Sequence, residues 1–238
     1  MDAVPDVNSS GNISGIVRWI IKTSIGIILL ALAMFISSGR LDWMMAWAFL
    51  GIVVIDNAIL GIYASIKCPE LLEERSRMKE GTKEWDKILA PLVALVVPIF
   101  IWIAAGLDYR FGWSPEIPVE IQVVFLAVAL LGSLLTTWAM VTNRFFAPTV
   151  RIQDERGQTT VTSGPYRFVR HPGYLGVIIF DLATPVALGS FWAFIPALIV
   201  TILFFIRAFL EDDTLKNELP GYRDYAVKVR YRLIPGLW

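Results

Sequence analysis

The chain has 238 residues, 56% of them hydrophobic, and its basic and acidic side chains balance to a formal charge of zero. This composition is too apolar for an ordinary soluble domain. A chain without net charge gives no electrostatic basis for binding nucleic acid. Because there is one cysteine, Cys68, and one histidine, His171, the chain can build neither an internal disulfide nor a His/Cys metal cage. We therefore expect a membrane protein without a metal site and without a nucleic-acid partner.

Six apolar runs follow a polar N-terminal segment, residues 1–15, which we expect to be mobile. About 20 apolar residues cross a bilayer as a helix, and all the runs except the fifth reach that length. No basic segment precedes the first run and no cleavage pattern follows it, so we interpret it as a retained span rather than a signal peptide. The runs cover residues 16–36, 43–66, 88–107, 119–141, 173–188 and 191–210.

These runs predict an all-α, polytopic integral membrane protein with about six transmembrane helices. The last two runs form a helical hairpin, and a polar cytoplasmic tail, 211–238, follows it. We divide the chain into N-terminal transmembrane helices, 1–141, and a C-terminal region, 142–238, that carries the candidate chemistry.

Two features of the first region have alternative interpretations. Asp56 lies inside the second run, where an acidic side chain either serves the function or hydrogen-bonds a neighbouring helix. The charged connector 67–87 is either a helix on the membrane surface or, in the interpretation we prefer, a solvated helical turn.

Lys and Arg are concentrated in alternate loops. The loops 67–87 and 142–172 and the tail carry six, five and five of them, whereas the loops 37–42, 107–118 and 189–190 carry one, one and none. Cytoplasmic loops are enriched in Lys and Arg. The bias therefore predicts a multi-pass protein with both termini in the cytoplasm, and it places the segment 164–176, the candidate for an active site, at the cytoplasmic face.

The segment 164–176 is dense in cations, prolines and glycines, and it holds the only histidine. His171 precedes a proline, which pushes its backbone to an extended conformation, whereas Pro172 suits the first turn of a helix. We therefore expect a helix that starts at Pro172. Free N–H groups at a helix start, together with Arg170 and His171, favour an anion such as a carboxylate or phosphate. Alternatively, Arg170 and His171 only anchor the helix end among lipid headgroups.

A second charged group lies at the end of the last apolar run. Arg207 and Glu211 are four residues apart and share one helix face. If the hairpin folds back, both return to the face where His171 began. They then place an acid and a base beside the anion site, or they form a helix-end salt bridge.

Together these residues resemble the isoprenylcysteine carboxyl methyltransferase family, whose members are integral membrane enzymes that use S-adenosylmethionine. The resemblance covers roughly residues 143–235, and the wider group includes phospholipid N-methyltransferases. Two positions depart from the family pattern, because Asp212 replaces one of two paired glutamates and Gln158 stands where histidine is frequent. The matching residues are Gly164-Pro165-Tyr166, Arg170-His171-Pro172 with Tyr174 and Gly176, Arg207 with Glu211-Asp212, and Gly221-Tyr222 with Tyr225.

The resemblance implies a set of site residues. Arg207 matches the family's substrate-side arginine, and Arg207 and Glu211 are the candidate catalytic residues. One upstream cofactor contact falls on Arg151, or on Gln153 if the loop carries a one-residue gap. The other implied cofactor contacts are Gln158, Thr159, Thr160, Val161, Tyr166, His171, Pro172, Gly173, Tyr174 and Glu211.

The implied function is methyl transfer from S-adenosyl-L-methionine to a lipophilic acceptor that enters from the lipid bilayer, most like an isoprenylcysteine carboxylate, with S-adenosyl-L-homocysteine as product. Such an in-line displacement needs alignment more than acid–base catalysis. Glu211 suits the cofactor's ammonium, and Tyr166 or Tyr174 suits a cation against its ring. The alternatives are a phospholipid amine or thiol acceptor, an NADPH-dependent reductase related to the sterol reductases, or a lipid-binding protein without activity.

Overall fold

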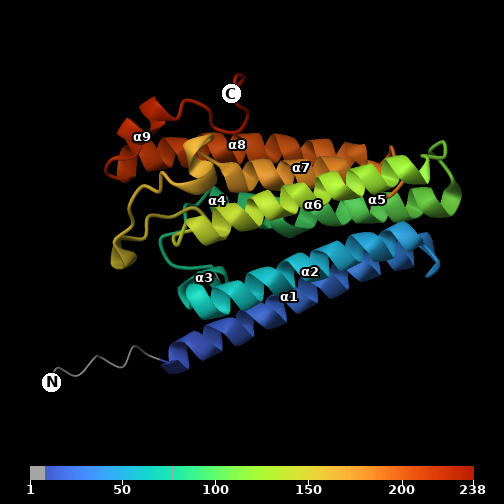
Figure 1. Ribbon diagram of the computed structural model, residues 1–238, viewed down its shortest axis with the longest axis horizontal. Coiled ribbons are helices and arrows are strands. Elements are labelled where there is room, and N and C mark those ends of the chain that lie inside the picture. Colours follow the sequence, from blue (N-terminus) through green and yellow to red (C-terminus); the bar gives the residue numbers. More distant parts are fainter. Residues whose placement is uncertain (1–8, 77) are drawn as a thin grey trace.

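The computed structural model describes residues 9–76 and 78–238 (Figure 1). Within these residues the chain is helical and has no β-strand. Helix α1, Ser9–Ser38, begins seven residues before the expected start at residue 16. Residues 1–8, the first part of the segment expected to be mobile, lie outside the described residues.

The other helices confirm the all-α membrane architecture. Five helical segments are long and apolar enough to cross a membrane, and the fifth apolar run forms the shorter apolar helix α7, Pro172–Ala187. In Figure 1, α5 to α8 lie roughly parallel, and α1 and α2 form a second pair with α3 at one end. The remaining bounds are α2 Met44–Lys67, α3 Pro69–Ser76, α4 Asp86–Pro91, α5 Val97–Phe111, α6 Val119–Thr142, α8 Phe194–Glu218 and α9 Tyr222–Lys228.

The third span is not a continuous α-helix. Five π-helical residues, Leu92–Val96, connect α4 to α5, and Pro91 and Pro98 stand at either side of them. Proline lacks an N–H group and its ring clashes with the carbonyl four residues earlier, so a wider turn accommodates both prolines. Other protein groups can satisfy the freed carbonyls, which is why such interruptions are tolerated in membrane helices.

The preferred interpretation of the connector 67–87 as a solvated turn is wrong. Helix α3 packs against α1 and α2, and it buries Leu71 and Leu72 in a cluster with Trp19 and Leu60. Glu74 and Asp86 are buried as well. Two leucines among many charges are a weak pattern in the sequence, yet they are enough to dock a helix whose buried acids find partners.

Helix α8 extends further than expected. The apolar run ends at residue 210, but the helix continues to Glu218, so Glu211 and Asp212 are helical and do not begin a tail. Asp212 is completely buried. Its charge is compensated by basic partners from other segments, which the sequence pattern of α8 alone does not reveal.

Two glycines allow α6 and α7 to approach closely. A Cβ atom on Gly176 would lie 2.6 Å from the carbonyl oxygen of Gly132, and one on Gly132 would lie 2.7 Å from the carbonyl oxygen of Gly176. Small residues permit such close backbone contact between membrane helices. The hydroxyl of Thr136 in α6 also donates to the carbonyl of Gly173 at 3.2 Å. The start of α7 is therefore fixed against α6.

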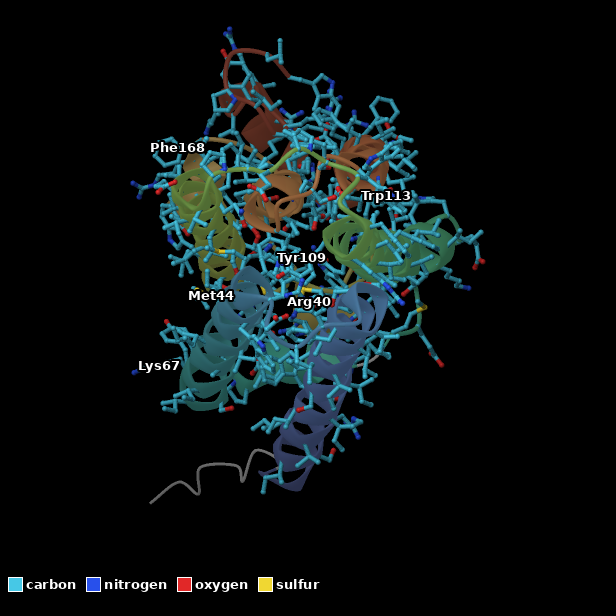
Figure 2. The ribbon with its side chains drawn as sticks, turned by 90° about the vertical axis from the view of Figure 1, so that its right-hand side faces the viewer. Arg40, Met44, Lys67, Tyr109, Trp113 and Phe168 are labelled. Carbon is cyan, nitrogen blue, oxygen red and sulfur yellow. The ribbon has the colours of Figure 1, made fainter. Side chains whose placement is uncertain are left out.

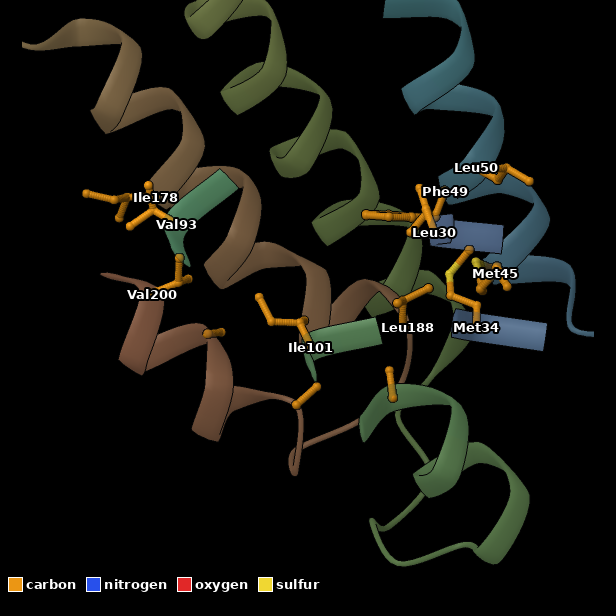
Figure 3. Close-up of a cluster of buried hydrophobic side chains, with 14 of the residues drawn as sticks. Leu30, Met34, Met45, Phe49, Leu50, Val93, Ile101, Ile178, Leu188 and Val200 are labelled. Carbon is orange, nitrogen blue, oxygen red and sulfur yellow. The ribbon is translucent and has the colours of Figure 1, made fainter. Parts of the chain in front are cut away.

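The largest apolar core joins α1, α2, α5, α7 and α8, and Figure 3 shows part of it, with Phe49, Ile101 and Val200 among the buried side chains. Figure 2 views the molecule from the end at which Arg40, Tyr109 and Trp113 lie. There Trp43 stacks on the Tyr109 ring at 4.6 Å, and the Arg40 guanidinium lies 5.5 Å from the same ring. Aromatic rings with basic partners suit a membrane–water interface.

Asp56 joins α2 to α6. Its carboxylate accepts hydrogen bonds from Ser133 at 2.6 Å and from Thr137 at 3.2 Å. The structure thus favours the second interpretation of this buried acid, in which it hydrogen-bonds a neighbouring helix.

The contact between α6 and α7 generates a first prediction. Replacing Gly176→Ala forces a methyl group into backbone atoms of α6, so we expect the free energy of unfolding to fall by about 1–3 kcal/mol. In the matched control Gly26→Ala, the new methyl meets no atom within 4 Å. That control is expected to be neutral or to stabilise α1 by up to about 1 kcal/mol. Thermal unfolding in detergent measures both, and equal melting temperatures would show that α6 and α7 do not depend on this contact.

Candidate active site

Helix α7 starts at Pro172, with His171 as the residue before it, as predicted from the sequence. The backbone N–H groups of Arg170 and His171 donate to the carbonyls of Tyr231 and Arg232, at 3.0 and 2.9 Å. The C-terminal segment therefore holds the entrance of the helix. Because the chain before Pro172 is not helical, the amides of Gly173 and Tyr174 have no intrahelical acceptor and remain at the helix start.

Asp212 is the centre of a buried ionic network beneath this helix start. Arg170 donates to its two oxygens at 2.6 and 3.1 Å, and Arg232 donates at 3.0 Å. Lys216 adds an ion pair at 2.7 Å and the Tyr222 hydroxyl a hydrogen bond at 3.0 Å. The network joins the segment before α7, helix α8 and the C-terminal tail. Arg170 is thus committed to a structural partner and is not a free cation for an external anion.

Glu211 lies beside His171 and Tyr174. The Tyr174 hydroxyl donates a short hydrogen bond to Glu211 Oε2, and His171 Nδ1 is 3.8 Å from the same oxygen. The rings of His171 and Tyr174 are stacked, with centroids 5.6 Å apart. Since these contacts use one carboxylate oxygen, Oε1 of Glu211 has no hydrogen-bond partner within the described part of the chain. The side chain of Glu211 is 23% exposed, so a ligand can reach it.

A pocket open to solvent lies next to these residues, and its free space is about 810 Å³ with the open mouth included. Eleven of the twelve predicted cofactor contacts line it, whereas Pro172 and Arg207 do not. The lining members of the predicted set are Arg151, Gln153, Gln158, Thr159, Thr160, Val161, Tyr166, His171, Gly173, Tyr174 and Glu211.

The loop that forms the outer wall is held by its own side chains. Arg151 donates to Glu74 of α3 at 2.9 and 3.0 Å and pairs with Glu155 at 2.7 Å. The amide of Gln153 donates to the carbonyl of Phe145 and accepts a hydrogen bond from Arg156. Both upstream candidates, Arg151 and Gln153, therefore line the pocket while supporting the loop.

Arg207 forms a different ion pair from the one the sequence indicates. Its guanidinium donates to both oxygens of Asp86 at 2.8 and 2.9 Å and to the carbonyl of Pro148 at 2.8 Å. The described residues contain no Arg207–Glu211 salt bridge. The pairing arises because Asp86 is completely buried and comes from the connector before α4, 121 residues away in the chain. Arg207 also lies 5.1 Å from the Tyr174 ring, so it supports that ring from outside the pocket.

Several pocket residues were not assigned from the sequence. Tyr222 and Tyr225 belong to the matching motif but received no role, and nothing in the sequence marks the aromatic pair after α6. Asp86 and Glu74, whose charges complete the surroundings of the pocket, lie in the connector that was interpreted as solvated. The unassigned lining residues include Asn143, Phe145, Phe146, Leu215, Leu219, Tyr222 and Tyr225.

The pocket offers no phenolate at neutral pH. Burial raises the pKa values of Tyr166 and Tyr225 well above the usual value for a phenol. The Tyr225 hydroxyl donates to the carbonyl of Tyr166 at 2.7 Å. Within the described residues, no group of three or more His, Cys, Asp or Glu side chains is placed to hold a metal ion. The site therefore presents hydrogen-bond donors, one carboxylate and aromatic faces.

Comparison with known proteins finds a family similarity in the region that forms most of this pocket. Residues 124–217, which run from α6 through most of α8, match the model of the isoprenylcysteine carboxyl methyltransferase (ICMT) family. This part of the chain is similar to the ICMT family. The matched segment contains the pocket loop, the start of α7 and Glu211, so the similarity and the geometry concern the same residues.

Each individual relative matches this chain over only part of its own length. The chain is 30% identical over 112 residues to a probable protein-S-isoprenylcysteine O-methyltransferase of rice, covering 46% of this chain and 59% of that protein. It is 31% identical to the Schizosaccharomyces pombe protein-S-isoprenylcysteine O-methyltransferase, covering 45% of this chain and 47% of that protein. It is also 33% identical over 81 residues to the 7-dehydrocholesterol reductase of Arabidopsis thaliana, covering 33% of this chain and 19% of that protein. The chain thus spans about half the length of these two O-methyltransferases.

The Asp212 network generates a second prediction. Asp212→Asn leaves Arg170 and Arg232 without their buried counter-charge, so we expect the free energy of unfolding to fall by about 3–5 kcal/mol. The adjacent Asp213 is exposed and bonds only Asn217 of its own helix, so Asp213→Asn is the matched control and is expected to change stability by less than about 0.5 kcal/mol. Thermal unfolding in detergent tests the pair. Similar melting temperatures for the two variants would contradict the central role of Asp212.

Proposed function

We propose that the protein is an S-adenosyl-L-methionine-dependent membrane methyltransferase that acts on a lipophilic acceptor, most like an isoprenylcysteine carboxylate. The observation that supports this most strongly is the position of the pocket. It lies inside the ICMT-family segment, between the start of α7 and Glu211, and eleven residues implied by the family pattern line it.

The residues present fit the cofactor. S-adenosylmethionine carries a carboxylate, an ammonium and a sulfonium. Glu211 is the one acidic side chain among the described residues that line the pocket, and its Oε1 is available to the ammonium. The amides of Gly173 and Tyr174 at the start of α7 suit the carboxylate. The rings of Tyr166 and Tyr222 line the same pocket and offer faces for a cation.

Methyl transfer requires little acid–base catalysis from the protein. When bound, the cofactor supplies a methyl group on an already activated carbon. The protein must exclude water and align an acceptor with that carbon. A carboxylate acceptor needs no proton removed, which agrees with a pocket whose tyrosines stay protonated. We assign Glu211 to the cofactor and Arg207, with Asp86 behind it, to the acceptor side.

The membrane supplies the acceptor in this proposal. Helix α7 packs against the membrane-length helices α5, α6 and α8, and the outward faces of the membrane-length helices carry large exposed apolar side chains that suit a lipid environment. A lipophilic acceptor dissolves in the bilayer and approaches from the side, while the loop side of the pocket faces the cytoplasm, where a water-soluble cofactor is available. The excess of Lys and Arg in the loops on that side supports this orientation.

Two alternatives remain distinct in their chemistry. A phospholipid amine or a thiol acceptor would use the same cofactor pocket with another acceptor group. A reductase is favoured by the similarity to 7-dehydrocholesterol reductase, and it would bind NADPH in place of S-adenosylmethionine. Binding of S-adenosylhomocysteine or of NADPH to the detergent-purified protein distinguishes a methyltransferase from a reductase. Labelled-methyl transfer to synthetic acceptors distinguishes a carboxylate acceptor from an amine or a thiol.

The division between Glu211 and Arg207 generates a third prediction. Glu211→Gln removes the charge that we assign to the cofactor's ammonium. The dissociation constant for S-adenosylhomocysteine should therefore rise about ten- to a hundredfold, the value of a hydrogen bond to a charged group. Arg207→Lys keeps a positive charge near Asp86 but loses the planar fork, so it should leave that constant nearly unchanged and slow turnover. Calorimetry and methyl-transfer rates measure these effects.

The opposite pattern would overturn this assignment. If Glu211→Gln binds S-adenosylhomocysteine normally, the carboxylate serves only to hold Tyr174. If both variants show wild-type binding and wild-type turnover per folded molecule, Arg207 and Glu211 are structural residues.

The orientation generates a fourth prediction. In a Cys68→Ser background, a cysteine at the exposed position Asp154 should react with a membrane-impermeant maleimide only after intact cells are opened. A cysteine at Glu116, exposed in the loop after α5, should react from outside. Labelling of position 154 from outside would place the pocket on the wrong face for a cytoplasmic cofactor.

A further inference from the structure

Arg75, in the last turn of α3, is a partly buried cation. Its Nε atom is inaccessible to solvent and has no hydrogen-bond partner. Its guanidinium lies 5.5 Å from the ring of Phe146. Among the described residues, no carboxylate forms an ion pair with it. A polar atom that is shut off from water and makes no hydrogen bond is costly, so the unsatisfied Nε calls for an explanation.

The three buried arginines near the site are each paired with a carboxylate. Arg151 pairs with Glu74, Arg170 with Asp212, and Arg207 with Asp86, each at 3.0 Å or less. Arg75 differs from them, although it is adjacent in sequence to Glu74, which is committed to Arg151. The charge on Arg75 is therefore left for a partner that the described chain does not supply.

Arg75 and Arg207 lie close enough to influence each other. Burial and the neighbouring Arg207 charge lower the pKa of Arg75 to about 10, so the side chain is still protonated at neutral pH. Asp86 compensates one of the two guanidinium groups. The Nη1 atom of Arg207 makes no hydrogen bond within the described residues, since its bonds to Asp86 and Pro148 use Nε and Nη2. Arg75 thus adds a positive charge near Arg207 that no described carboxylate pairs with, and the Lys22 ammonium lies beside it, 3.2 Å from the Arg75 carbonyl.

Phe146 connects this charge to the pocket. Its ring lines the pocket and also packs against the α1–α3 cluster that contains Leu72. A Cβ atom on Gly173 would lie 2.7 Å from the Phe146 ring, so the ring sits directly on the first turn of α7. Arg75 therefore lies one aromatic ring away from the helix start to which we assign the cofactor, on an element that packs against membrane helices α1 and α2.

We propose that Arg75, together with Arg207, binds the carboxylate of the methyl acceptor and selects an anionic acceptor over an amine. This inference rests on the proposed methyltransferase function. It adds to the family segment a residue from the N-terminal half of the chain, outside the matched residues 124–217. Methylation converts the carboxylate to a neutral ester, so the bond to Arg75 weakens when the reaction is complete and the product is released.

The test uses the full-length protein in neutral detergent, where no anionic lipid headgroup is present. The acceptor is an N-acetylated S-prenylcysteine, with labelled S-adenosylmethionine as donor. For Arg75→Gln we expect the KM for the acceptor to rise about ten- to a hundredfold, with an unchanged dissociation constant for S-adenosylhomocysteine. Arg75→Lys should restore part of the loss. The matched control is Arg18→Gln, because Arg18 on neighbouring α1 is already paired with Glu73 at 2.8 Å.

A binding comparison adds a readout that a purely structural role would not change. The wild type should bind the prenylcysteine acid more tightly than its methyl ester, and Arg75→Gln should lose this preference while binding the ester normally. Because Arg75 has no acidic partner, its removal leaves no carboxylate unpaired, so the variant should also keep its melting temperature.

The outcomes separate the two proposals. An unchanged KM and an unchanged preference for the acid in Arg75→Gln would overturn the role of Arg75, and so would a joint loss of S-adenosylhomocysteine binding and melting temperature. A wild type that binds S-adenosylhomocysteine but does not methylate the acid would overturn the carboxylate acceptor itself, and a wild type that binds NADPH instead would overturn the methyltransferase proposal.

Discussion

The buried carboxylate of Asp212 is the interaction on which the candidate site depends. A single negative charge inside the protein is tolerated only because several cations surround it. Those cations come from the segment before α7, from α8 itself and from the C-terminal tail, so the one charge determines the relative positions of three separate parts of the chain. Glu211 precedes Asp212 on the same helix, and its position beside Tyr174 follows from that arrangement.

A second ion pair, Arg207–Asp86, likewise fixes the relative positions of separate chain segments, on the other side of the α7 start. Asp86 also accepts the backbone N–H of Val150 at 2.6 Å, so it ties the third span to the pocket loop as well as to α8. Glu74 similarly ties α3 to the pocket loop through its ion pair with Arg151. The N-terminal helices therefore contribute acids that hold the C-terminal region in shape, and the boundary drawn at residue 141 separates segments that share buried charges.

The sequence was informative where a signal is local. The length of the apolar runs predicted the spans, and the His171-Pro172 pair predicted the start of α7. Family resemblance led to eleven lining residues. Prediction from the sequence failed where a structural feature depends on residues far away in the chain. No local pattern shows that Asp86 pairs with Arg207 across 121 residues. The local sequence also does not show that α8 continues past residue 210, where cations from other segments neutralise Asp212, or that Leu71 and Leu72 dock α3.

The hydrogen bonds from Arg170 and His171 to residues 231 and 232 have a consequence for biosynthesis. The entrance of α7 is synthesised before α8, whereas its backbone partners are synthesised only after α8. Until then Asp212 lacks the charge of Arg232, and the entrance of the helix is unsupported. The nascent protein therefore holds an incomplete pocket until residues 231 and 232 are made and bind the entrance of α7.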